Sequence, residues 1–244
     1  MSYFQIEGLV KKFGGLIALN GINLSLDQGE VVGLIGPNGS GKTTLFNCIS
    51  NFHTPDAGKI VFKGRRLDGL PTHQICKLGI GRTFQIVKPL KRLTVLENVM
   101  AGAFLRTDDM RIAREEALAA LEFCELSHRK EMLVKDVPIA DKKRVEVARA
   151  FATAPELLLL DETAAGLNLK EIERMLEIVR KISESGVTCL VVEHVMKFVV
   201  GVCDRVTCIN FGREIATGKP HEVMSHPEVI EAYLGAEYAK GRRH

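Results

Sequence analysis

The chain has 244 residues, a length that fits a single α/β domain with an appendage. Apolar residues make up 46% and charged residues 26%, so a hydrophobic core can offset chain entropy without disulfides or metal, and nothing indicates disorder. The formal net charge of +3 is too small and too dispersed to indicate a nucleic-acid partner, and short basic runs such as 142–144 are interpreted as solvated faces.

Cysteine usage and hydropathy indicate where the protein works. The six cysteines include no Cys-x-x-Cys pair, which favours reduced, buried thiols over a disulfide framework or a zinc site. The first residues lack the basic and apolar regions of a signal peptide, and no apolar run approaches the ~20 residues of a membrane span. We therefore expect a cytoplasmic protein that needs another chain if it acts at a membrane.

The first elements in chain order are strands. Residues 3–7 and 22–26 alternate apolar and polar side chains, as half-buried strands do. Residues 31–35 form a continuous apolar run of the kind that central parallel strands show. We expect an antiparallel flank on a parallel sheet.

A phosphate-binding loop (P-loop) directly follows the third strand. Gly36-Pro-Asn-Gly-Ser-Gly-Lys-Thr43 matches G-x-x-x-x-G-K-[ST], and a helical run at 44–49 comes after it, which is the context that the motif requires. A chance match occurs in about one chain in a hundred of this length, and the context lowers that frequency further. In such a loop backbone N–H groups turn inward to an anion, Lys42 neutralises phosphate charge and the Thr43 hydroxyl ligates Mg²⁺. The residues predicted to bind ATP here are Gly36, Pro37, Asn38, Gly39, Ser40, Gly41, Lys42, Thr43 and Thr44.

Residues 71–150 are expected to form, approximately, a helical subdomain inserted into the α/β core of a single domain spanning 1–244. Thr94-Val-Leu-Glu97 is a capping box that opens one helix. Apolar residues recur at helical spacing from Ile112 to Cys124 and predict a second helix.

The remaining elements return to strand and helix. Residues 157–160 and 187–192 are continuous apolar runs, and a helix capped by Asn168 and Glu171 is predicted between them, as in βαβ units. The tail is expected to hold two short strands within 204–218 and a helix from about 227 to 234.

An acidic pair ends the strand at 157–160. A P-loop site needs an aspartate that holds magnesium through water and a group that polarises the attacking water, and Asp161 and Glu162 fit these two roles. Alone the pair is a weak signal, because acidic residues often start loops after buried strands.

Taken in order, these motifs resemble the ATP-binding subunits of ABC transporters over nearly the whole chain. The resemblance implies that Phe13 stacks on adenine, that Gln85 is the Q-loop glutamine and a metal ligand, and that His194 is the switch histidine. It places the D-loop at 165–168. Considered singly, Phe13 could be a core residue, Gln85 a solvated one and His194 a hydrogen-bonded histidine at a strand end.

A narrower resemblance, to the LivG-type subunit of branched-chain amino-acid importers, lies in the segments 79–85, 93–99 and 227–235. Relatives that serve urea or other small solutes look much alike. This resemblance implies ATP hydrolysis that powers import, with Mg²⁺ as cofactor and a peripheral location on the inner face of the cell membrane. It implies as partners a second nucleotide-binding subunit, two transmembrane permease subunits and, indirectly, a solute-binding protein. Contacts with the solute would then lie in those other chains.

The chain departs from this family at the signature, typically Leu-Ser-Gly-Gly-Gln, which falls on Val137, Pro138, Ile139, Ala140 and Asp141. In the family the signature of one subunit faces the γ-phosphate bound by the other. Pro138 lacks an N–H, Ala140 adds a methyl group, and an ionised Asp141 would place a negative charge there. We therefore expect a different chain as partner. Without the family, Asp141 is a good N-cap for the next helix and Pro138 an ordinary loop residue.

Two alternatives stay open. A non-catalytic, ATP-dependent dimerisation module is favoured by the altered signature and opposed by Glu162 and His194. A soluble ABC ATPase of translation or DNA repair would usually show two cassettes or a long coiled-coil insert, and the sequence has neither.

Overall fold

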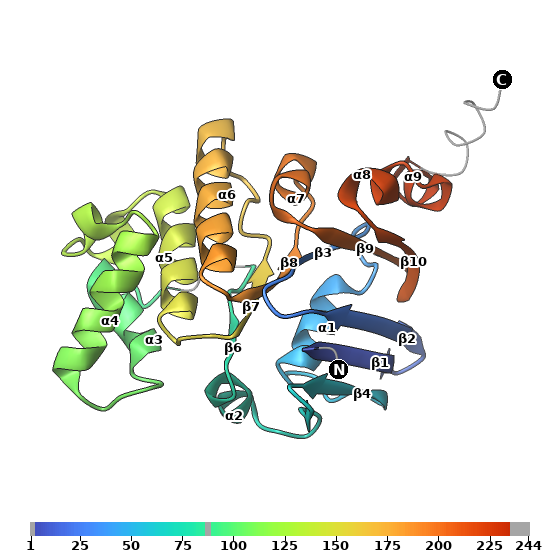
Figure 1. Cartoon of the computed structure of the whole chain (residues 1–244), viewed down its shortest axis with the longest axis horizontal. Helices are drawn as coiled ribbons and strands as arrows, with labels where there is room; N and C mark the ends of the chain where they lie inside the picture. The colour runs from blue at the N-terminus through green and yellow to red at the C-terminus, as the bar shows by residue number, and fades with distance from the viewer. Residues whose placement is uncertain (1–2, 86–88, 235–244) are drawn as a thin grey trace. The chain divides into compact units, whose positions relative to one another are not determined.

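The computed structural model describes residues 3–85 and 89–234. The chain divides into two compact units, the first made of Met1–Thr72 with Leu190–His244 and the second of His73–Cys189. Figure 1 shows the elements of both units along the chain.

The first unit contains an antiparallel sheet in the order β2-β1-β4-β5, with β1 (Phe4–Phe13), β2 (Leu16–Leu26), β4 (Ala57–Phe62) and β5 (Arg65–Arg66). The predicted segments 3–7 and 22–26 fall in β1 and β2, which confirms the antiparallel flank. Both strands are longer than predicted because register shifts between Ile6 and Leu9 and further along β1 interrupt the alternation that the sequence displays. Helix α1 (Lys42–Ile49) packs beside β2 (Figure 1).

The same unit contains the strand that leads into the P-loop. β3 (Val31–Ile35) is buried at every residue and pairs in parallel with β9 (Arg205–Asn210), and β9 pairs antiparallel with β10 (Arg213–Gly218). β9, β10 and helix α9 (Pro227–Leu234) confirm the two short strands and the helix predicted for the tail. Helices α7 (Met196–Val202) and α8 (Pro220–Met224) were not predicted. In Figure 1, α8 and α9 lie beside β9 and β10 in orange to red.

The second unit is mostly helical. It contains α2 (Thr72–Lys77), which begins at the unit boundary, α3 (Val95–Ala103), α4 (Met110–Phe123), α5 (Ile139–Phe151) and α6 (Leu169–Glu184). Helices α3, α4 and α5 pack against one another (Figure 1). Short β6 (Ile80–Arg82) pairs in parallel with β7 (Leu157–Asp161), and β8 (Thr188–Val192) crosses the unit boundary.

Both predicted capping boxes are confirmed. The Thr94 and Asn168 side chains accept from the backbone N–H groups of Glu97 and Glu171, and each glutamate accepts in return from the backbone N–H of its cap residue. These reciprocal bonds satisfy N–H groups that have no partner inside the helix, so the sequence fixes where α3 and α6 begin.

The α/β fold with parallel strand pairs, flanking helices and an antiparallel flank is confirmed. The segment 71–150 holds α2 to α5 together with β6, and its status as an inserted subdomain stays a prediction. All six cysteines are free and five are buried, and burial raises the pKa of the Cys124 and Cys189 thiols to about 12. Within 3–85 and 89–234, no helix combines the length and the apolar character needed to cross a bilayer.

Candidate active site

The P-loop of the first unit has a backbone conformation that depends on glycine. Gly36, Gly39 and Gly41 have φ angles of 149°, 79° and 113°. A Cβ atom at Gly36 would lie 2.1 Å from the Ile209 carbonyl oxygen, and one at Gly41 would lie 2.7 Å from the Ala18 carbonyl oxygen. Both contacts are with backbone, which cannot move aside as a flexible side chain can. The neighbouring strands β2 and β9 therefore leave room for glycine alone at these two positions.

Helix α1 begins at Lys42, two residues before the predicted helical run, with Gly41 at the N-cap position. Gly41 has no side chain, so the sequence carries no capping signal there, and no side chain caps the first turn of α1. An uncapped helix N-terminus next to a glycine loop presents backbone N–H groups and positive dipole to an anion. The loop and the first turn of α1 thus form a site suited to phosphate.

Lys42 lies inside this loop with 8% of its surface exposed. Its Nζ donates to the carbonyl oxygens of Gly36 at 2.6 Å and Pro37 at 2.9 Å, and lies 3.5 Å from the Ser40 Oγ. These bonds place the ammonium inside the loop, where its positive charge can attract the phosphates of a nucleotide.

Phe13 and His194 are the two other predicted site residues of the first unit. Phe13 ends β1 with 43% of its surface exposed, so it is not a core residue, and its ring meets that of His53 edge-on with centroids 5.1 Å apart. His194 follows β8, is exposed, and donates its backbone N–H to Glu193 Oε2 at 3.3 Å. Phe13 thus presents ring surface on which an adenine base can stack.

In the second unit, Asp161 ends β7 and is held at both its backbone and its side chain. The Arg82 Nη2 donates to Asp161 Oδ2 at 3.2 Å, and the Asp161 N–H donates to the Thr83 Oγ1 at 3.0 Å. Burial lowers the pKa of the Arg82 guanidinium, and the Asp161 carboxylate opposes that shift. Asp161 is therefore a fixed carboxylate whose charge is balanced by a buried arginine.

The sequence did not predict a role for Arg82, which pairs with Asp161. Parallel pairing of β6 with β7 sets Arg82 opposite Leu159, two residues before Asp161. In the sequence, the segment 79–85 indicates only a family resemblance. Neither the existence of the three-residue strand β6 nor its register can be read from so short a segment.

Gln85 and Glu162, both predicted site residues, lie together in this unit. Gln85 Nε2 donates to Glu162 Oε2 at 2.8 Å, and the buried Lys143 Nζ donates to the Glu162 carbonyl oxygen at 2.7 Å. Glu162 has a φ of 50°, a left-handed conformation that costs a non-glycine residue on the order of 1 kcal/mol. The bond from Lys143 stabilises this strained turn and so helps to direct the Glu162 carboxylate.

The interpretation of 142–144 as a solvated basic face is wrong for two of its residues. Lys143 is 9% exposed and Arg144 is 6% exposed. They are buried because each reaches oxygen acceptors inside the unit: Lys143 bonds to Glu162, and Arg144 bonds to Asp141 and to the carbonyl oxygens of Cys124 and Glu125. A run of like charges in the sequence does not reveal such acceptors.

The altered signature, Val137–Asp141, spans the start of α5, and the N-cap prediction for Asp141 is wrong. Pro138 occupies the N-cap position without a side-chain bond, and Asp141 lies inside the first turn. Asp141 is 6% exposed, pairs with Arg144, and lies 3.3 Å from Arg129 Nε. Its negative charge is thus compensated by two arginines of its own unit, which removes the argument that it would repel a phosphate.

Comparisons with known proteins agree with this geometry. The family model for ABC transporters matches residues 19–165. A second model, for branched-chain amino acid ATP-binding cassette transporters, matches residues 213–239, and the structure describes this segment as far as residue 234. The high-affinity branched-chain amino acid transport ATP-binding protein LivG of Salmonella typhimurium is 42% identical over 94% of this chain and 96% of its own length.

Solved structures give the same result. The ADP conformation of MJ1267, an ATP-binding cassette of an ABC transporter, is 32% identical, covers 96% of this chain and 99% of its own, and has a TM-score of 0.88. The dimeric structure of the ATP-binding cassette MJ0796 bound to ADP and Pi is 27% identical. It covers 89% of this chain and 98% of its own, and its TM-score is 0.81. The expected P-loop core is confirmed by these likenesses, and the chain belongs to the ABC transporter family, among its ATP-binding cassettes.

Proposed function

We propose that the chain binds and hydrolyses Mg-ATP and thereby powers the import of branched-chain or other hydrophobic amino acids through separate membrane subunits. The observation that carries the proposal is the P-loop, whose glycines are required by backbone contacts and whose buried Lys42 places its ammonium against the carbonyl oxygens of Gly36 and Pro37. The class of solute comes from the name of the LivG relative and from the second family model.

The oxygen donors of the proposed site suit magnesium. The Thr43 hydroxyl, the Gln85 amide oxygen and the Asp161 carboxylate are hard ligands, and Mg²⁺ typically takes one or two carboxylates together with substrate phosphates. In the described ranges no group of three or more His, Cys, Asp or Glu side chains could hold a metal without such help. When bound, the ion would neutralise charge on the transferred phosphoryl group.

We assign the remaining chemistry to this chain's own residues. Lys42 neutralises phosphate charge, Phe13 stacks on adenine, Glu162 orients or deprotonates the attacking water, and His194 holds the γ-phosphate. The hydrogen bond from Gln85 to Glu162 supports placing these two side chains at one reacting centre.

We also propose that the chain works as a pair with a second nucleotide-binding subunit, beside two permease subunits and a solute-binding protein, on the cytoplasmic face of the membrane. The dimer of MJ0796 and the transport function named for LivG support this assembly. The solute would be bound by the other chains.

The state of the signature favours a different chain as the partner. A signature loop needs free N–H groups, a hydroxyl and little bulk to reach a phosphate across an interface. Pro138 has neither an N–H nor a hydroxyl, Ala140 carries a methyl group, and Ile139 is 56% exposed at the start of α5. A homodimer would contain two such loops, whereas a mixed pair would keep one intact signature facing this chain's P-loop.

A non-catalytic dimerisation module is the second candidate, and the altered signature is the observation that favours it. The two candidates differ in where the reaction occurs. Under our proposal ATP bound at this chain's P-loop is hydrolysed when the partner supplies an intact signature, and under the alternative it is bound without hydrolysis.

Uptake measurements test the proposed solute. Deleting the gene in its host should abolish high-affinity uptake of radiolabelled leucine, isoleucine and valine, and a plasmid copy should restore it. Urea uptake serves as the control and should not change. Loss of urea uptake with leucine uptake intact would assign the chain to another solute.

Partial repair of the signature tests the mixed pair. The purified chain alone should hydrolyse ATP slowly, and the double variant Pro138→Ser, Ala140→Gly should raise its rate at least about tenfold, because an N–H, a hydroxyl and space are restored. Asp141 is kept, since its carboxylate balances the buried Arg144 and the half-buried Arg129. The exposed Asp136→Asn change is the control. Fast hydrolysis by the unmodified chain, without gain in the double variant, would contradict the mixed pair.

A further inference from the structure

Helix α9, the last helix within the described residues, contacts the P-loop through a hydrogen bond that none of the predicted roles uses. The backbone N–H of Gly36 donates to the Tyr233 hydroxyl at 2.8 Å. Gly36 is the first residue of the P-loop, and Tyr233 lies in the last turn of α9. Both residues belong to the first unit.

The peptide groups around Gly36 are held from several sides. Its N–H is bound by Tyr233, its carbonyl oxygen accepts from Lys42, and its Cα packs so closely on β9 that a side chain would collide with Ile209. Its φ of 149° lies in a region that glycine adopts readily and other residues rarely do. If a bound phosphate replaced the Gly36 and Pro37 carbonyl groups as the partner of Lys42, the hydrogen bond from the Gly36 N–H to Tyr233 could remain, because it uses a different atom.

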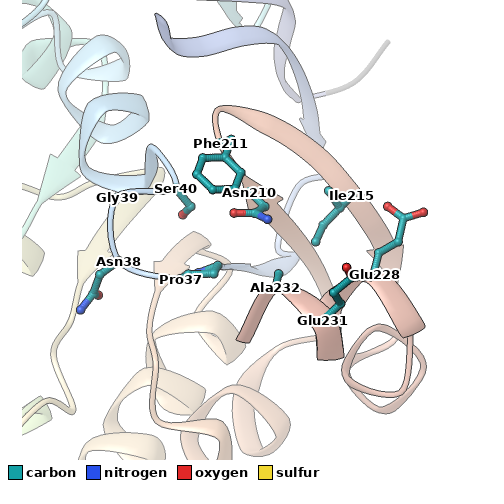
Figure 2. Close-up of a pocket in the computed structure, with 10 residues that line it drawn as sticks. All are labelled: Pro37, Asn38, Gly39, Ser40, Asn210, Phe211, Ile215, Glu228, Glu231 and Ala232. Atoms are coloured by element: carbon teal, nitrogen blue, oxygen red, sulfur yellow. The ribbon is translucent and has the colours of Figure 1, made fainter. Parts of the chain in front are cut away.

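A cavity separates the rest of α9 from the loop. Its volume is about 460 Å³, and Figure 2 shows the P-loop on one side, the β9–β10 hairpin with Phe211 on another, and α9 with Glu228 and Glu231 on a third. Beside this cavity, α9 and the loop are joined by a polar contact. The hydroxyl of Tyr233 supplies such a contact.

We infer that Tyr233 is a positioning residue for nucleotide binding: its hydroxyl fixes the Gly36 peptide and thereby keeps the P-loop in the conformation that receives phosphate. This inference rests on the proposed binding of nucleotide at the P-loop. A tyrosine hydroxyl is neutral at physiological pH, and the partial burial of Tyr233 raises its pKa further, to about 12, so it accepts from Gly36 without adding a negative charge near the phosphates.

The expected size of the effect follows from one neutral hydrogen bond. Without the hydroxyl, the Gly36 N–H turns to water in the cavity and the loop populates other conformations, so the apparent affinity falls with the fraction of competent loop. Net loss of such a bond corresponds to a weakening of ADP and ATP binding by about threefold to tenfold. The ring of Tyr233 would still pack, so the fold should persist.

Tyr233→Phe tests this inference, since it removes one oxygen atom and keeps the ring. Tyr3→Phe is the matched control, because it removes the same atom from a ring of the same unit that packs against Phe62 instead. ADP binding in the presence of Mg²⁺ is measured by titration calorimetry on the purified full chain, and hydrogen exchange is measured for the peptide that contains Gly36. We expect weaker ADP binding and faster exchange in Tyr233→Phe and neither change in Tyr3→Phe.

The outcomes separate the inference from the proposed function. Equal ADP affinity in the wild type and Tyr233→Phe would overturn the positioning role, even if the melting temperature fell, because a merely structural contact predicts that pattern. Equal weakening in Tyr3→Phe would overturn it as well. A wild-type chain that binds no ADP would instead contradict nucleotide binding itself.

Discussion

Replacing Glu162 with glutamine is expected to lower ATP hydrolysis by about 10²-fold to 10⁴-fold, the usual contribution of a positioned general base, while ATP binding persists. Glutamine has nearly the same size as glutamate, and the bonds from Gln85 to the side chain and from Lys143 to the backbone can both remain. The variant keeps the geometry but cannot take a proton from water, so ATP-bound pairs should accumulate.

Phosphate release measured with the cognate second subunit checks this expectation, and size-exclusion chromatography detects the trapped pair. The exposed Glu177→Gln change on α6 is the control and should leave the rate unchanged. If Glu162→Gln hydrolysed ATP at the wild-type rate, the proposed role of Glu162 would be wrong and the non-catalytic alternative would be favoured.

Lys42→Ala is expected to weaken Mg-ATP binding by about 100-fold or more, because two or more charge-assisted hydrogen bonds to phosphate are lost. The carbonyl groups of Gly36 and Pro37 would then face the phosphates with no cation between them. Titration with a fluorescent ATP analogue measures the loss.

Lys170→Ala, at the exposed start of α6, is the matched control for this experiment. Circular dichroism is used to confirm that the Lys42→Ala protein is folded before its affinity is compared with that of the wild type. Wild-type affinity in Lys42→Ala would mean that nucleotide does not bind at the P-loop.

Local signals in the sequence predicted much of the fold. The buried strands β3, β7 and β8 appear as continuous apolar runs, and the starts of α3 and α6 are marked by residues that bond within one turn. Such signals depend on neighbours in the chain, so a single sequence carries them. The start of α1 was missed because glycine marks it by the absence of a side chain.

The supporting contacts of the candidate site could not be predicted in this way. Arg82 reaches Asp161 through the register of two short strands, Lys143 reaches Glu162 across a helix–loop contact, and Tyr233 meets Gly36 from the far end of the chain. Each pair is distant in sequence and close in space. A motif names the residue that does chemistry, whereas its supports depend on tertiary packing.

The buried ion pair of Asp141 with Arg144 has a consequence for how this sequence can change. Removing one partner of a buried pair typically costs about 3–5 kcal/mol, a large part of the ~5–15 kcal/mol that stabilises a folded domain. A single mutation that restored glutamine at this position would leave Arg144 and Arg129 without their shared carboxylate. A return to the family's signature therefore requires earlier replacement of these arginines. The loss of the signature is, in evolutionary terms, difficult to reverse one substitution at a time.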